Sequence, residues 1–249
     1  MRGTRMENNK IRINKYLSQC GVCSRREADR MLDAGAVTVN GYPVSKGTLV
    51  TSSDSIYVEG VPVRNSPPEI VIAFHKPAGI VCTSSKKDKA ETIIEYIGFP
   101  ERIYPVGRLD KQSTGLILLT NNGQMTDDIL RGSNYHEKEY VVTLDREMTP
   151  SIYKAMEQGV PILDTMTRPC RITHRKGKVF HITITQGLNR QIRRMCEYFG
   201  YRVKNLKRIR IMNIQLGDLE EGKWRYLTDE ELSELKEECR RKGSSTAPI

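Results

Sequence analysis

The segment YPVGRLDKQSTGLILLTNNG, residues 104–123, carries the strongest structural signals in this chain. Within it, Leu116 to Thr120 is a largely apolar run bounded by turn residues, which predicts a buried strand. Asp110 stands in the loop just before this strand, and proteins commonly place functional groups on loops of a rigid scaffold. The alternative is that Asp110 only caps a turn, and the local pattern taken alone favours that alternative.

Further strands and helices are predicted on both sides of this segment. Apolar or alternating patterns predict strands at 70–74, 139–144 and 203–214, and a helix is predicted at 189–199 with Asn189 as its cap. Several predicted strands follow one another without a crossover helix. The sequence therefore predicts an α+β fold, with a mixed, largely antiparallel sheet and flanking helices.

Residues 11–60 have the pattern of a separate small α/β module. Ser24 and Glu27 match a capping box at the start of a helix, and Asn40-Gly41 is a hairpin turn signal between two strands. The following stretch, VPVRNSPPE, holds three prolines and predicts a stiff linker. We therefore expect a flexible leader at 1–10, the module at 11–60, a linker at 61–69, a larger domain at 70–238 and a basic tail at 239–249.

The composition favours a polyanionic partner. Lys and Arg number 40 against 30 Asp and Glu, which gives a net charge of +10. Ordinary solubility would explain the same surplus, so the distribution of the charge must decide. No apolar run approaches the roughly 20 residues of a membrane helix. We expect a cytoplasmic protein with no membrane partner, and a monomer by default.

Metal or cofactor chemistry has little support in the sequence. Cys20 and Cys23 form a lone CxxC without a second cysteine pair or paired histidines, so they are expected to be small packing residues. The four histidines are scattered, and no Walker or dinucleotide glycine pattern occurs. We therefore expect no metal and no cofactor, which leaves catalysis by ordinary side chains or no catalysis.

Arginines gather at the start of the helix predicted at 189–199. Cations at a helix N-terminus oppose the macrodipole, and Arg190 repels Arg193 and Arg194 at the spacings that face each other. A sequence that keeps such local conflicts usually does so at a functional site. These groups could bind phosphate or hold a carboxylate such as Asp110 ionised. A solvated basic face is the alternative.

Two further basic clusters are candidate RNA contacts, although either could be a solvated surface. In the small module, Arg26 and Arg30 lie four residues apart on one helix face, as a phosphate-tracking helix requires. Late in the chain, two arginines are expected on one face of a strand. The members of the two clusters are Arg25, Arg26 and Arg30, and Lys207, Arg208 and Arg210.

Taken together, these segments resemble a known family over nearly the whole chain. Residues 12–60, with NKYLSQCGVCSRREADRML and VTVNGYPV, resemble the small RNA-binding domain of ribosomal small-subunit protein four. The segments HKPAGIV, PVGRLDKQSTGLILLTNNG, HEKEYVVTL and QGLNRQIRRM resemble the RsuA/RluB/RluF branch of pseudouridine synthases. The resemblance implies isomerisation of uridine in structured RNA without a cofactor. The expected target is a hairpin of large-subunit ribosomal RNA, with transfer RNA as a second candidate.

The resemblance also implies roles for three residues. Asp110, in GRLD, corresponds to the family's nucleophilic aspartate, which attacks either the ribose anomeric carbon or the uracil ring. Arg193, in RQIRR, corresponds to the arginine that pairs with this aspartate. Tyr140, in KEYVV, corresponds to the tyrosine that stacks on the base and handles a proton.

Other positions are implied to contact RNA. Because a paired uracil must leave the stack before a side chain reaches it, Arg108 is expected to fill the vacated space. Lys76 and Gln191 are expected to contact phosphate or the RNA backbone. The rival hypothesis is a non-catalytic ribosome-binding or assembly factor, which would bind RNA without isomerising it.

Overall fold

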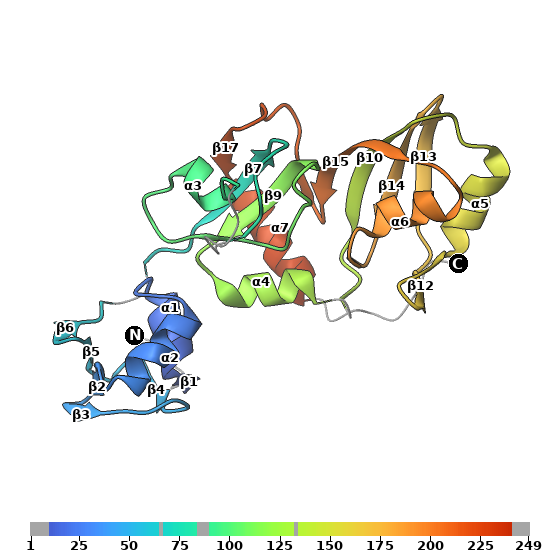
Figure 1. Ribbon diagram of the computed structural model, residues 1–249. Coiled ribbons are helices and arrows are strands. Elements are labelled where there is room, and N and C mark those ends of the chain that lie inside the picture. Colours follow the sequence, from blue (N-terminus) through green and yellow to red (C-terminus); the bar gives the residue numbers. More distant parts are fainter. Residues whose placement is uncertain (1–9, 65–66, 84–89, 132–133, 241–249) are drawn as a thin grey trace, which may run out of the picture. The chain divides into compact units, whose positions relative to one another are not determined.

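The computed structural model describes residues 10–64, 67–83, 90–131 and 134–240. The chain forms two compact units, Met1–Glu69 and Ile70–Ile249, so the division falls after the proline-rich stretch. Figure 1 shows the elements of both units.

The first unit packs two helices on short strands. Its helices are α1 (Ile13–Gln19) and α2 (Arg25–Asp33), and its core holds the buried residues of both. The Ser24 hydroxyl accepts a hydrogen bond of 3.1 Å from the Glu27 amide, as the capping pattern predicts. The strands are β1 (Ile11–Arg12), β2 (Val37–Val39), β3 (Tyr42–Pro43), β4 (Leu49–Val50), β5 (Ile56–Val58) and β6 (Val61–Pro62).

The predicted linker begins too early. The sheet order is β3-β2-β5-β6, and Val61 pairs with Val58 across a turn at Glu59-Gly60, so residues 61–62 belong to the first unit. Proline is compatible with this strand because β6 lies at the edge of the sheet, where a missing amide donor costs little. The prolines therefore indicated correctly where the regular pattern ends, but they did not locate the first residue of the linker.

The second unit is built on a mixed sheet with the order β13-β14-β10-β15-β9-β7-β17. Only the β15–β9 pair is parallel among the neighbours on this path, which confirms the predicted α+β class. Its strands are β7 (Val71–Lys76), β8 (Tyr104–Pro105), β9 (Thr114–Thr120), β10 (Lys138–Leu144), β11 (Pro161–Ile162), β12 (Thr165–Met166), β13 (Arg171–Lys176), β14 (Val179–Ile184), β15 (Val203–Ile211), β16 (Ile214–Gln215) and β17 (Trp224–Tyr226).

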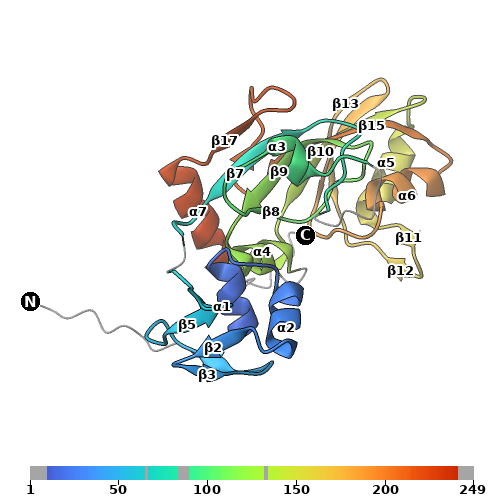
Figure 2. The same ribbon diagram turned by 60° about the vertical axis from the view of Figure 1, so that its left-hand side comes forward.

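Helices cover both faces of this sheet. Ile72 and Phe74 of β7 point to a core shared with α3, α5 and α6, whereas Val71 and Ala73 point to a second core with α4 and α7. Helices α4 and α7 lie side by side in both views (Figures 1 and 2). Burial on both faces favours a continuous apolar run, as at 70–74, and the buried His75 and Lys76 complete the strand. The helices are α3 (Ile93–Ile97), α4 (Gly123–Leu130), α5 (Pro150–Gln158), α6 (Gln191–Tyr198) and α7 (Asp229–Arg240).

Two boundaries differ from the sequence prediction. The strand predicted at 203–214 is a hairpin of β15 and β16, which turns at Met212 in the left-handed region (φ 51°). Helix α6 is capped by Arg190, also left-handed (φ 51°), and not by Asn189. Arg190 makes no side-chain cap hydrogen bond, and its side chain reaches Asp110 instead, with Nη1 3.7 Å from Oδ2.

Candidate active site

A cleft of about 480 Å³ opens in the second unit, a volume typical of small-molecule sites. Its walls come from the loop before β9, the end of α4, the start of β10, the segment before α6, and β15. The lining residues are Gly107, Arg108, Leu109, Asp110, Ile129, Leu130, Arg131, His136, Lys138, Tyr140, Thr185, Gln186, Gly187, Leu188, Asn189, Arg190 and Arg208.

Asp110 presents its carboxylate between two guanidinium groups. Its Oδ2 lies 3.5 Å from Arg193 Nε and 3.7 Å from Arg190 Nη1, and the side chain is 32% exposed. The turn that follows is closed by the backbone, since the Ser113 amide donates to the Asp110 carbonyl oxygen at 2.9 Å. The carboxylate does not close this turn and faces the cleft instead.

Arg193 is held in place from two directions. Only 8% of it is exposed; Nη1 donates to the Val203 carbonyl oxygen and Nη2 to Ser113 Oγ, each at 3.2 Å. Ser113 belongs to the same loop as Asp110, so this guanidinium connects the start of α6 with the loop. The cations that conflict with the α6 dipole therefore face a carboxylate, which offsets their repulsion.

Arg208 supports Tyr140 on the buried wall of the cleft. Its Nη1 donates to Tyr140 Oη at 3.4 Å and its Nε to the Leu116 carbonyl oxygen at 2.7 Å. Arg208 is 3% exposed and Tyr140 is 7% exposed. The remaining nitrogen, Nη2, is buried and has no hydrogen-bond partner among the described residues.

Lys138 is a cleft residue that the sequence reading missed. It lies two positions before Tyr140 on β10, so both side chains are on the same face of the strand. It is half-buried, and Nζ donates to the His136 carbonyl oxygen at 3.2 Å. Burial, with a smaller contribution from the charge of Arg208, lowers the pKa of Lys138 to about 8. The period-two spacing from Tyr140 was the available signal.

Replacement of Lys138 by methionine is expected to raise the free energy of unfolding by up to about 3 kcal/mol at neutral pH. The folded pKa of about 8 lies below the ordinary 10.5, so folding disfavours the cation. This penalty is full below the folded pKa and disappears as the pH rises to the unfolded value. Urea denaturation should therefore show the variant's advantage shrinking between these two pH values. An advantage independent of pH would assign it to packing instead.

Two predicted RNA contacts are wrong. Lys76 has no exposed surface, and its Nζ donates to the carbonyl oxygens of Pro77, Lys111 and Ser113 at 2.8, 3.2 and 2.9 Å. Gln191 is 4% exposed, and its Oε1 accepts from the Leu188 amide at 3.1 Å. The polar groups of both side chains are hydrogen-bonded to the backbone. Lys76 stabilises the loop that carries Asp110, and Gln191 closes the turn that leads into α6.

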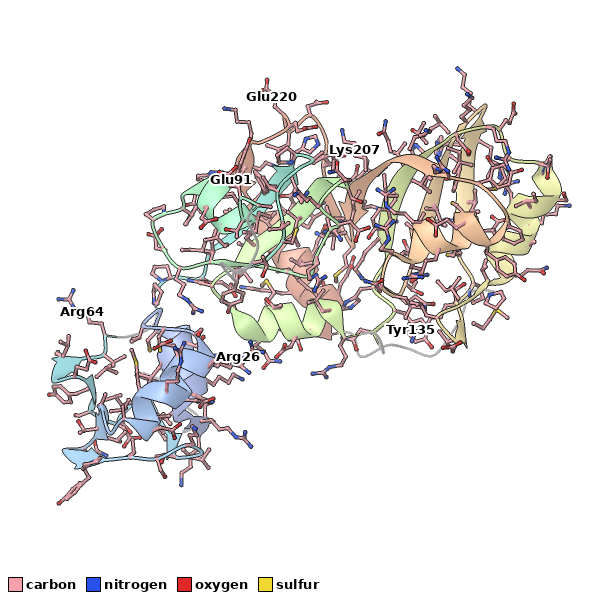
Figure 3. The ribbon with its side chains drawn as sticks, in the orientation of Figure 1. Arg26, Arg64, Glu91, Tyr135, Lys207 and Glu220 are labelled. Carbon is pink, nitrogen blue, oxygen red and sulfur yellow. The ribbon has the colours of Figure 1, made fainter. Side chains whose placement is uncertain are left out.

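The other predicted RNA contacts differ in their exposure and in the groups with which they are paired. Arg108 is exposed at the cleft, whereas Arg194 folds back on Asn189, with Nε 3.0 Å from its carbonyl oxygen. Arg210 is paired with two carboxylates, at 2.7 Å and 3.0 Å, which leaves it poorly placed for phosphate. In the first unit, Arg25, Arg26 and Arg30 are exposed on α2, and Arg30 pairs with Glu27; Figure 3 shows Arg26 projecting from that helix.

Comparison with known proteins decides the family. Residues 70–198, which include Asp110, Tyr140 and Arg193, match the family described as RNA pseudouridylate synthase, and residues 11–56 match the S4 domain. The chain belongs to the RNA pseudouridylate synthase family. It is therefore an RNA-modifying isomerase with an N-terminal RNA-binding domain, as the resemblance of its motifs implied.

Individual pseudouridine synthases match along most of the chain. The dual-specificity RNA pseudouridine synthase RluF of Escherichia coli (strain K12) is 44% identical over 245 residues, which cover 98% of this chain and 84% of RluF. Ribosomal large subunit pseudouridine synthase B of Bacillus subtilis (strain 168) is 32% identical, covering 90% of this chain and 95% of the relative. A crystal structure of a pseudouridylate synthase superposes with a TM-score of 0.67 at 29% identity, covering 90% of this chain and 99% of the other.

The described part of this pseudouridine synthase has no helix that is long and apolar enough to span a membrane. Within the same residues, His, Cys, Asp and Glu form no group of three or more that could hold a metal ion. The buried Cys23 packs in the core of the first unit.

Proposed function

We propose that this synthase isomerises a uridine in a hairpin of large-subunit ribosomal RNA, with Asp110 as its nucleophile. The position of the Asp110 carboxylate is the main support for this proposal. It faces the cleft between Arg193 and Arg190, and Tyr140 lines the same cleft. A carboxylate can form a covalent adduct and leave again, as the detachment and return of a base require. No cofactor enters this scheme.

The reaction replaces the bond between N1 of the uracil and the ribose with a bond between C5 and the ribose. Asp110 adds either to the ribose anomeric carbon or to the uracil ring, and the bond between N1 and the ribose breaks. The ring turns and forms a bond from C5 to the ribose, the bond to the Asp110 carboxylate breaks, and C5 loses its proton while N1 gains one. Arg193 aims the carboxylate, and Tyr140 stacks on the ring and handles a proton.

Entry of the base requires its extrusion from the RNA stack. Arg108 is exposed at the cleft, two residues before the nucleophile, so its side chain is available to occupy the vacated space. Arg131 and Arg190 are exposed at the same cleft and suit phosphates on either side of the target. On the first unit, Arg25 and Arg26 are the exposed cations we assign to RNA.

The choice of target rests on the relatives. One is named a dual-specificity synthase and another a large-subunit ribosomal synthase. We accordingly take ribosomal RNA as the main substrate and transfer RNA as a second one, and a cytoplasmic monomer as the working form. Single-stranded loops are the usual sites of specific RNA recognition, which favours a hairpin.

The decisive experiment measures tritium release from ribosomal RNA labelled at C5 of uridine. The wild-type protein is expected to release tritium in proportion to the pseudouridine formed, and the same position should lose its modification in cells that lack the protein. Binding of the RNA without tritium release would favour the rival function, a non-catalytic assembly factor. Transcripts of transfer RNA test the second substrate in the same assay.

A further inference from the structure

Two cations stand together on the buried wall of the cleft without a carboxylate partner. Arg208 and Lys138 form no ion pair with any described residue. Each is anchored by the backbone: Arg208 by the Leu116 carbonyl oxygen and Lys138 by that of His136. Buried charges are normally paired, because an unpaired one costs free energy. The pair is therefore a preformed site for negative charge.

The cations of the cleft differ in how deeply they are buried. Arg108, Arg131 and Arg190 are exposed, whereas Arg208 is 3% exposed and Lys138 is half-buried. Phosphodiesters stay at the surface of a folded RNA, so the exposed arginines suit them. The inner pair lies beside the Tyr140 phenol, to which Arg208 Nη1 donates at 3.4 Å. A base stacked on Tyr140 would thus bring its edge, and not its phosphate, to Lys138 and Arg208.

We propose that Arg208, through Nη2, and Lys138, through Nζ, bind the carbonyl oxygens of the extruded uracil and stabilise the negative charge that the ring acquires during the reaction. This assignment rests on the proposed function. If Asp110 adds to the ribose, the N1–ribose bond breaks with its electron pair going to N1, and the charge spreads to the ring oxygens. If Asp110 adds to the ring, electrons move to a ring carbonyl oxygen. The same wall serves both routes.

The geometry fits stabilisation of a developing charge. Arg208 donates from Nε to the Leu116 carbonyl oxygen and from Nη1 to Tyr140 Oη, and these two bonds fix the orientation of the guanidinium. Its third nitrogen, Nη2, is buried without a partner among the described residues. A donor that is fixed beforehand and shielded from water needs no reorganisation when charge appears. Lys138 adds a positive charge that burial destabilises, so a negative charge that develops beside it would stabilise the cation and be stabilised in turn.

Protonation of Lys138 should then be visible in the pH dependence of the rate. The pKa of Lys138 is about 8, and kcat/KM reports the groups of the free enzyme, so this parameter should fall as the pH rises through that value. The titratable and charged groups that share the cleft with Lys138 are Arg108, Asp110, Arg131, His136, Tyr140, Arg190 and Arg208. Because the uracil also responds to pH, the comparison must be between variants.

The test measures single-turnover tritium release and RNA affinity over a range of pH. Lys138→Gln is expected to lower the rate about 100-fold at saturating RNA, the loss typical of one such donor, and to leave affinity within about threefold. Lys138→Arg keeps its charge at all pH values used, so its alkaline fall in kcat/KM should move to higher pH even if its rate is reduced.

Lys154→Gln is the matched control. Lys154 is exposed on α5, outside the cleft lining and outside the basic clusters considered for RNA binding. This variant loses the same charge and should keep the wild-type rate. A Lys138→Gln rate within threefold of wild type, or a loss of affinity with an unchanged rate at saturation, would overturn the proposal; the second result would assign Lys138 to phosphate. Absence of release by the wild type would instead refute the proposed function.

Discussion

Replacement of Asp110 by asparagine is expected to lower pseudouridine formation by about 10⁴-fold or more, the usual consequence of losing a nucleophile. Asparagine has nearly the same shape, so the loop closed by the Ser113 amide should keep its conformation. The amide cannot form and release a covalent adduct as the carboxylate does. Single-turnover tritium release measures the effect directly.

The same variant separates a catalytic Asp110 from a structural one. Its RNA affinity should stay within about threefold of wild type or rise slightly, because the exposed Arg190 loses its anionic partner and becomes available to phosphate. Asp218→Asn, in an exposed turn, removes the same charge away from the cleft and should leave the rate unchanged. Residual activity within tenfold of wild type, or loss of the folded state, would refute the assigned role.

Sequence patterns located the centre of the site and two arginines of its walls, Arg190 and Arg208, but not Lys138. The conflict of three arginines with a helix N-terminus was visible locally, and the structure places two of them beside Asp110. The local pattern allowed an arginine of this helix to hold Asp110, but the choice of Arg193, 83 positions later in the chain, required the family resemblance. Lys76 was misassigned for the same reason, because the three carbonyl oxygens that bind its ammonium come together only when the loops after β7 and before β9 fold against each other.

Short elements and their ends escaped prediction where tertiary contacts decide them. Helix α3 spans five residues, too few for a periodic pattern, although Thr92 and Glu95 form a capping box at its start. The division of β15 from β16 depends on a left-handed Met212, a conformation that its side chain does not favour. The buried strands β7 and β9 were predictable because their composition alone requires burial on both faces.

Replacement of Gly115 by alanine is expected to lower the free energy of unfolding by about 3–5 kcal/mol, among the largest effects of a single substitution. Gly115 has a φ of +103° and pairs with Arg208 where β9 and β15 run parallel. A Cβ atom there would lie 2.2 Å from the Arg208 carbonyl oxygen and 2.6 Å from its amide nitrogen. Both are backbone atoms in a sheet, so relief requires the strands to separate.

Urea denaturation of Gly115→Ala beside Gly217→Ala compares this contact with a glycine of positive φ that has room for a Cβ atom. Gly217 also has a positive φ, +54°, but a Cβ there meets nothing within 4 Å, so its replacement should cost only about 1 kcal/mol. A Gly115→Ala loss no larger than that of Gly217→Ala would show that the sheet yields easily. Any folded Gly115→Ala protein should also isomerise uridine slowly. Separation of β15 from β9 moves Arg208 away from the Leu116 carbonyl oxygen, and with it the support of Tyr140. Close packing at one glycine therefore sets the geometry of the wall that faces the uracil.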